Sequence, residues 1–113
     1  MEKLYVVVRG DLEPGLRAAQ ACHAQRQFAS DYPEDDHAWF TNSNTIVLLE
    51  VPDIEALVDL TFALDRRDIK YARFIEPDLG HELTAIAVAP EGRPICQRLP
   101  LAFKGDFRAT HAA

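Results

Sequence analysis

The sequence has little of what metal sites, disulfide scaffolds and membrane spans require. Its 113 residues include two cysteines, Cys22 and Cys96, which lack CxxC or Cys/His metal spacing, so free buried thiols are expected. The longest apolar runs, 4–8 and 46–49, are far below the roughly 20 residues of a transmembrane helix. The first residues lack the apolar stretch of a secretory signal. We therefore expect a cytoplasmic protein with no membrane contact.

The common catalytic loops are missing as well. No glycine-rich phosphate loop, HExxH motif or GxSxG motif occurs, and we expect neither a cofactor nor a metal. Excess positive charge is also absent, because the formal net charge is −6. Binding to nucleic acid depends on lysine and arginine at the phosphates, so a nucleic-acid partner would need a local basic patch. The candidates are Arg9, Arg17, Arg93, Arg98, Lys104 and Arg108.

The order of local patterns predicts a small α/β protein. Residues 4–8 are apolar without alternation, as in a central strand covered on both faces, and residues 45–51, 69–76 and 83–89 also favour strands. Residues 16–30 predict a helix, and a second helix should follow the N-cap Asp53 and end near Arg67. Residues 31–43 have no clear period and predict a loop with at most one helical turn. Residues 77–81 predict a turn, 90–99 a short helix, and the tail from Lys104 should fray.

These elements give the order β-α-β-α-β-β-α within one domain, residues 1–113. The two crossovers favour parallel strands with right-handed connections, and the short third connection favours an antiparallel pair. We therefore expect a three-layer α/β/α fold with a mixed four-stranded sheet. A ferredoxin-like sandwich is the alternative, but it would need a strand within residues 31–43.

The first helix carries the residues with most chemical interest. A helical wheel predicts a sheet-facing side with small and apolar residues and an opposite polar side. The first side holds Ala18, Ala21, Cys22, Phe28 and Ala29, and the second holds Arg17, Gln20, His23, Arg26 and Gln27. Gln20 and His23 are three residues apart, so both could face one cleft beside the preceding turn.

Three motifs together resemble a known family. They are Arg9-Gly10-Asp11-Leu12 after a strand, a glycine-containing turn, and the helical run Ala18-Ala19-Gln20-Ala21-Cys22-His23-Ala24. This combination is similar to the N-terminal motif of the type 2 (archaeal and eukaryotic) peptidyl-tRNA hydrolases. Weaker likeness continues through residues 46–52, 55–57 and 84–90.

The resemblance implies hydrolysis, without a metal, of the ester that joins a peptide to the terminal ribose of tRNA. Such a site needs a group that orients or deprotonates water and donors for the oxyanion. The resemblance gives His23 the first role, Gln20 and Thr84 polar positioning roles, and Glu76 the role of the partner carboxylate, with Asp78 as the alternative. Arg9, Asp11 and Arg17 would bind the tRNA acceptor end.

Two departures from the family pattern bear on substrate. The family turn is rich in lysine, of the form Lys-Met-Gly-Lys-Gly-Lys, whereas this one is shorter and has Glu13 where a lysine is expected. An anion there opposes tRNA binding. Two other functions therefore stay open: a non-catalytic binding module on the same fold, and hydrolysis of another small ester or amide. The resemblance also implies a homodimer, with Trp39 and Phe40 as its apolar contact or, alternatively, as core residues.

Overall fold

The computed structural model describes residues 2–104, which hold a four-stranded sheet with the strand order β2-β1-β4-β3. The strands are β1 (Lys3–Arg9), β2 (Thr45–Val51), β3 (Tyr71–Glu76) and β4 (Glu82–Val88). β1 pairs with β2 in parallel and with β4 antiparallel, and β4 pairs with β3 antiparallel. The mixed sheet is confirmed, as are the parallel crossover and the antiparallel pair around the short connection.

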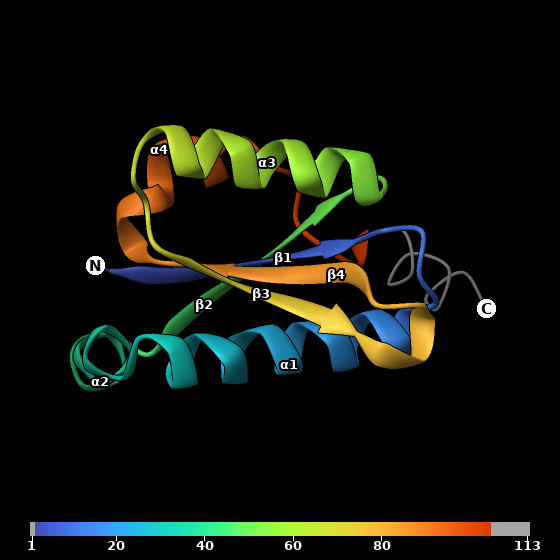
Figure 1. Cartoon of the computed structure of the whole chain (residues 1–113). Coiled ribbons are helices and arrows are strands. Elements are labelled where there is room, and N and C mark those ends of the chain that lie inside the picture. Colours follow the sequence, from blue (N-terminus) through green and yellow to red (C-terminus); the bar gives the residue numbers. More distant parts are fainter. Residues whose placement is uncertain (1, 105–113) are drawn as a thin grey trace.

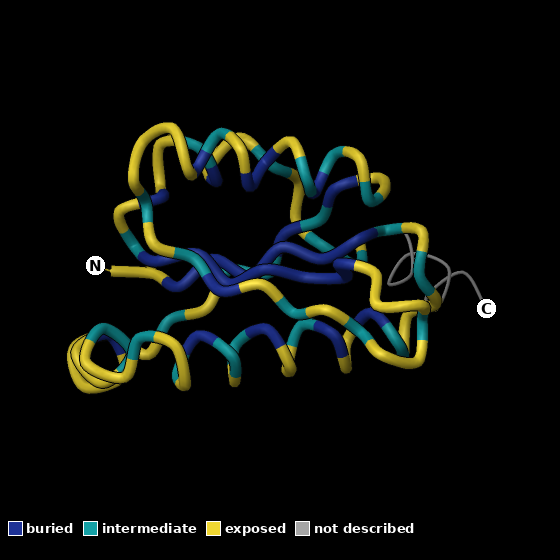
Figure 2. Tube along the Cα trace, viewed as in Figure 1, coloured by how far each residue is buried: buried dark blue, intermediate teal, exposed yellow. Residues whose placement is uncertain are grey.

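Helices cover both faces of the sheet (Figure 1). α1 (Pro14–Asp31) and α2 (Pro33–Asn42) lie on one side, and α3 (Ile54–Arg66) and α4 (Arg93–Cys96) lie on the other. Short 3-10 helices occupy Pro77–Leu79 and Pro90–Gly92. The central strands β1 and β4 are buried along nearly their whole length (Figure 2). The predicted three-layer α/β/α fold is therefore confirmed, and the tail beyond Lys104 lies outside the described residues.

The prediction of a loop over residues 31–43 is wrong, because Pro33–Asn42 forms α2. Pro33 stands in the first turn, where its missing N–H is not needed, and three acids follow where they favour the positive end of the helix dipole. Trp39 is the buried residue of this helix, and its Nε1 donates to the Thr45 carbonyl at 2.9 Å. A single buried position gives no period, so the pattern could not reveal the helix. Phe40 remains exposed.

The side of α1 that packs on the sheet also differs from the helical-wheel prediction. Its buried residues are Arg17, Gln20, Ala24 and Phe28, whereas Cys22 is exposed. The wheel assigned Arg17 and Gln20 to solvent because it ranks residues by hydropathy alone. Both are buried because each finds polar partners, which removes most of the cost of leaving water. Cys96 is the buried thiol, and both thiols are free.

Candidate functional site

A β-bulge at the start of β4 brings the first site residue into position. Phe74 pairs with Ala85 and Ile75 pairs with Leu83, so Thr84 is an extra residue in β4. Leu83 and Ile86 pack in the core on the α3 side, whereas Ala85 packs on the α1 side. Regular alternation would place Thr84 on the α3 side with Ile86, but the bulge turns it toward α1.

Thr84 meets Gln20 of α1 in a buried polar relay. The Thr84 hydroxyl donates to Gln20 Oε1 at 2.5 Å, and Gln20 Nε2 donates to Glu76 Oε1 at 3.0 Å. The amide orientation follows from the partners, since a carboxylate only accepts and must face the NH₂ group. Gln20 and Thr84 are 1% and 0% exposed. The structure thus brings three predicted site residues, Gln20, Glu76 and Thr84, into one chain of hydrogen bonds.

The relay fixes the Glu76 carboxylate at the end of β3. Its Oε2 accepts from the backbone N–H of Asp78 at 3.4 Å, at the start of the Pro77–Leu79 turn. Asp78 itself is exposed and contributes its backbone N–H to the relay. Glu76, rather than the alternative Asp78, is therefore the carboxylate held by Gln20.

His23 lies one helical turn beyond Gln20 and is exposed. Its imidazole stacks on the Phe74 ring with centroids 4.5 Å apart and planes 19° from parallel. The ring nitrogens form no hydrogen bond with residues 2–104, and the side chain is exposed. The pair borders a shallow depression of about 570 Å³ lined by His23, Arg26, Gln27, Ala29, Ser30 and Phe74.

Arg9 ties the end of β1 to the start of β4. Its guanidinium donates to both Asp11 oxygens at 3.1 and 2.9 Å, to Glu82 at 2.7 Å and to the Leu83 carbonyl at 3.1 Å. The hydrogen bond with Arg9 holds the pKa of Asp11 below its ordinary value, and the same bond raises the pKa of Arg9. Because Leu83 adjoins the bulge, Arg9 braces the strand that presents Thr84.

Arg17 ties the turn between β1 and α1 to β2. It donates to the carbonyls of Gly10 and Leu12 and to Glu50 at 3.1 Å, and its guanidinium lies 4.9 Å from the centroid of Phe103. A Cβ at position 10 would lie 2.5 Å from the Glu50 carboxylate, so a larger residue there would displace the Glu50 side chain that Arg17 binds. Arg9 and Arg17 were predicted to bind substrate; in the structure both are buried among protein acceptors.

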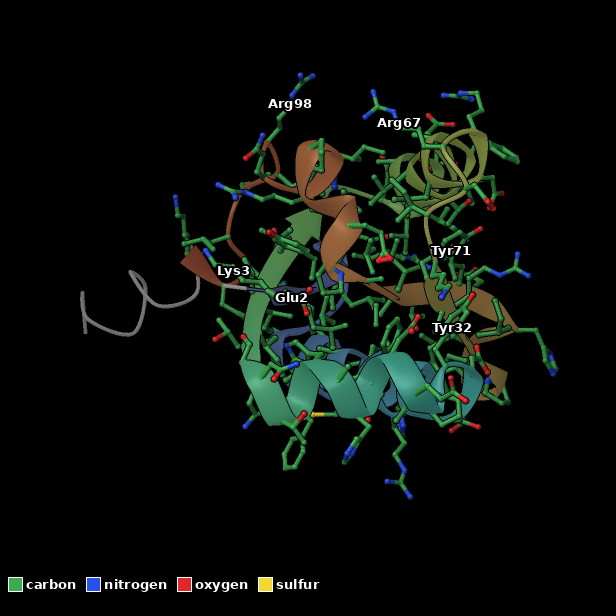
Figure 3. All side chains as sticks on the ribbon, turned by 90° about the vertical axis from the view of Figure 1, so that its left-hand side faces the viewer. Glu2, Lys3, Tyr32, Arg67, Tyr71 and Arg98 are labelled. Atoms are coloured by element: carbon green, nitrogen blue, oxygen red, sulfur yellow. The ribbon has the colours of Figure 1, made fainter. Side chains whose placement is uncertain are left out.

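Two other basic residues lie away from this site. Figure 3 shows Arg67 and Arg98 pointing outward on the layer of α3 and α4, across the sheet from α1. Arg26 lines the depression beside His23. Arg108 lies outside the described residues. Within residues 2–104, no cluster of three or more His, Cys, Asp or Glu side chains could hold a metal ion, and no helix could span a membrane.

A comparison with known protein families matches all the residues that form this fold. A family model described as peptidyl-tRNA hydrolase PTH2 matches residues 2–104 of the chain. The chain belongs to the PTH2 family of peptidyl-tRNA hydrolases. A comparison with curated proteins gave no significant match. Membership of the PTH2 family supports a peptidyl-tRNA hydrolase-like function with peptidyl-tRNA as substrate.

Two features of this PTH2 chain escaped the sequence analysis. The first is Phe74, the stacking partner of His23, which the pattern treated only as part of a strand. The second is the bulge at Thr84, since three consecutive residues of the type Leu-Thr-Ala carry no sign of an irregular strand. The sequence does contain one indication that Phe74 lies at the site. It stands two residues before Glu76, and residues i and i+2 share one face of a strand.

Proposed function

We propose that this PTH2 family member hydrolyses the ester of peptidyl-tRNA without a metal, at the surface where His23 and Glu76 lie. His23 orients the attacking water and accepts its proton, as a neutral imidazole can. Glu76 is the partner carboxylate, and Gln20 and Thr84 act as positioning residues because both are buried away from any substrate. We further propose a single cytoplasmic domain that acts as a homodimer.

The observation that carries the proposal is the relay from Thr84 through Gln20 to Glu76. A buried amide that bonds a hydroxyl on one side and a carboxylate on the other leaves Glu76 little freedom to rotate. Fixed polar groups lower a reaction barrier because they need not reorganise as charge develops. A surface glutamate with no such support would offer no comparable advantage.

The role that we propose for Arg9, Asp11 and Arg17 is structural and does not involve direct contact with phosphate. Their guanidinium and carboxylate groups bond one another, Glu82, Glu50 and backbone carbonyls. We propose that they hold the turn before α1 and the start of β4, and that the acceptor end of tRNA lies over the surface which they shape. Contact of either arginine with phosphate would require it to share its hydrogen bonds.

A non-catalytic binding module is the second candidate, and one observation favours it. Glu13 is exposed at the start of α1, beside arginines whose charge is already matched by Asp11, Glu82 and Glu50. Arg9 and Arg17 thus offer little net positive charge to a phosphate chain, whereas affinity for nucleic acid rises with each neutralised phosphate.

Release of free tRNA from N-acetyl-aminoacyl-tRNA by the pure protein separates the two candidates. We expect His23→Ala to lower kcat/KM by at least about a hundredfold, the smaller end of the range for loss of a general base. His37→Ala is the matched control, because His37 is also exposed on a helix but lies on α2. The wild-type rate should persist in EDTA. Background release by wild type and His23→Ala alike would refute hydrolysis and leave the binding module.

A further inference from the structure

The strand that carries Phe74 and Glu76 has an unpaired edge. β3 is the last strand of the sheet and pairs only with β4. The backbone N–H of Ala89 donates to the Lys70 carbonyl at 3.0 Å, which continues the register in which Tyr71 pairs with Val88. In an antiparallel pair these bonds recur at every second residue. The backbone groups of Lys70 and Ala72 therefore face β4, and those of Tyr71 and Arg73 face outward.

One of these outward groups is already bonded. The Tyr71 carbonyl accepts a hydrogen bond from the Tyr32 hydroxyl at 3.2 Å, at the end of the edge far from Glu76. The N–H and C=O of Arg73 have no partner of this kind within residues 2–104. Ile75, the next residue of the same parity, is 40% exposed. The open part of the edge thus begins at Arg73 and runs toward Glu76.

The edge lies in a depression between the two helical layers. The depression has a volume of about 420 Å³ and is lined by Asp31, Tyr32, Asp65, Tyr71, Arg73 and Ile75. Asp65 belongs to α3 and Asp31 to α1, so the walls come from opposite sides of the sheet. Figure 1 shows β3 with α3 above it and α1 below, and Figure 3 shows Tyr32 and Tyr71 together on one flank.

We propose that this edge binds the peptide part of peptidyl-tRNA as an added β-strand. The inference rests on the proposed function, since it places the ester beside His23 and Glu76. The peptide then runs back along β3 with its N-terminus toward Tyr71, which makes the added strand parallel to β3. At about 3.3 Å per residue, the three steps from Arg73, where the open edge begins, to Glu76 span about 10 Å and accommodate roughly four peptide residues.

Backbone pairing suits a substrate whose peptide has no fixed sequence. Added strands draw affinity from main-chain hydrogen bonds, and specificity enters only where side-chain pockets exist. Here the outward N–H of Arg73 would donate to one peptide carbonyl, and its C=O would accept from the N–H two residues further along. Hydrogen bonds of this pattern involve every second peptide amide and do not depend on the identity of the peptide side chains.

A second copy of the chain is the competing occupant of the edge. A symmetric pairing of β3 with β3 centred on Arg73 would place two arginines directly opposite each other, and like charges in that position destabilise a sheet. Arg73 and the preceding Lys70 are the kind of charged residues that protect exposed edges from such pairing. The peptide of the substrate meets no such repulsion.

The test uses the wild-type protein and a set of substrates. N-acetyltetrapeptidyl-tRNA is prepared with each amide nitrogen methylated in turn, since a methyl group removes one N–H without changing the side chains. We expect kcat/KM to fall about tenfold for methylation at alternate amides and to stay within about twofold for those between. N-acetyl-aminoacyl-tRNA, which cannot reach Arg73, measures the chemistry alone.

Substitution of Arg73 tests the same hydrogen bonds from the side of the protein. Arg73→Pro removes the outward N–H, and proline is tolerated on an edge strand where no ladder bond is lost. Its kcat/KM for the tetrapeptidyl substrate should fall about tenfold, with that for N-acetyl-aminoacyl-tRNA unchanged. Arg73→Lys is the control, because it keeps both the charge that protects the edge and the backbone N–H, and it should stay within about twofold on both.

The outcomes separate the subsite from the function. Equal rates for all methylated substrates, with normal hydrolysis of N-acetyl-aminoacyl-tRNA, overturn the subsite alone. No release from any substrate overturns the proposed function and the subsite with it. A wild-type dimer that Arg73→Pro converts to a monomer, together with a flat methylation profile, assigns the edge to a second copy and also overturns the subsite.

Discussion

The bond between Thr84 and Gln20 allows a quantitative test of the relay through protein stability. Thr84→Val keeps the side-chain shape and removes the hydroxyl, so Gln20 Oε1 loses the one donor that it has within residues 2–104. Gln20 is 1% exposed, and a buried acceptor left without a partner costs about 1–3 kcal/mol. We expect a loss of about 2 kcal/mol in the free energy of unfolding. For a chain of this length that loss lowers Tm by roughly 8 °C.

The complementary change removes the amide instead. Gln20→Met keeps an unbranched side chain of similar length and leaves the Thr84 hydroxyl buried without an acceptor. Glu76 loses less, because its half-buried carboxylate can take up water in place of Gln20. We again expect a loss of about 2 kcal/mol, from the cost of one buried unsatisfied group.

The double variant Gln20→Met/Thr84→Val measures the coupling energy between the two residues. Once both partners are apolar, neither is left unsatisfied, and replacing both partners of a buried hydrogen bond can be nearly neutral. The double variant should therefore lose only about 1 kcal/mol, the net worth of the hydrogen bond, rather than the sum of about 4, which is a coupling energy of about 3 kcal/mol. Urea unfolding of the four proteins at equal m-value measures it.

A second buried threonine provides the control for this cycle. The Thr61 hydroxyl donates to the Val58 carbonyl within α3 at 2.6 Å and is remote from the relay. Thr61→Val should add to Gln20→Met without coupling. A coupling energy below about 0.5 kcal/mol between Gln20 and Thr84, the level expected of independent sites, would refute the relay.

Two further predictions concern pH. The hydrogen bond with Arg9 holds the pKa of Asp11 in the folded protein below 3.8. The ionised Asp11 therefore stabilises the fold above about pH 4, and this stabilisation is lost as the pH falls through the pKa of Asp11 in the folded protein. The difference in unfolding free energy between wild type and Asp11→Asn, less than about 1 kcal/mol for this half-exposed pair, should therefore shrink from pH 6 to pH 2 in urea titrations; a constant difference would contradict it. At the alkaline end, burial raises the pKa of the Cys96 thiol from 9.0 to about 12, so its contribution is complete below pH 9 and is lost as the pH rises toward 12. At pH 10 the wild type should have lost about 1.4 kcal/mol more than Cys96→Ala, measured relative to pH 8; parallel profiles would show that Cys96 ionises equally in both states.

The strands could be predicted from the sequence because their signal is local. Val6, Val7 and Val8 are apolar in succession, and a strand buried on both faces requires that pattern. α3 was equally clear, since Asp53 caps it by accepting from the Ala56 N–H at 2.9 Å, as its place after Pro52 predicts. Both depend on residues that are neighbours in the chain.

The site could be predicted only in part because its contacts join distant residues. Gln20 and Thr84 are 64 positions apart, and neither looks like a core residue until its partner is known. The wheel for α1 failed at Arg17 for the same reason, since its acceptors Gly10 and Glu50 lie on other elements. The bulge at Thr84 depends on the register of β3 against β4, which no local pattern specifies.

The charges around the site indicate which part of the substrate the protein can recognise. Arg9 is matched by Asp11 and Glu82, and Arg17 is matched by Glu50, so neither guanidinium adds net positive charge to the surface. A phosphate chain gains affinity mainly through cations that displace its counterions. With these arginines committed to the protein, the proposed mode of binding draws more on the ester and on the peptide behind it. The ester is uncharged and the peptide backbone offers only hydrogen bonds, which the open edge of β3 can supply without any positive charge.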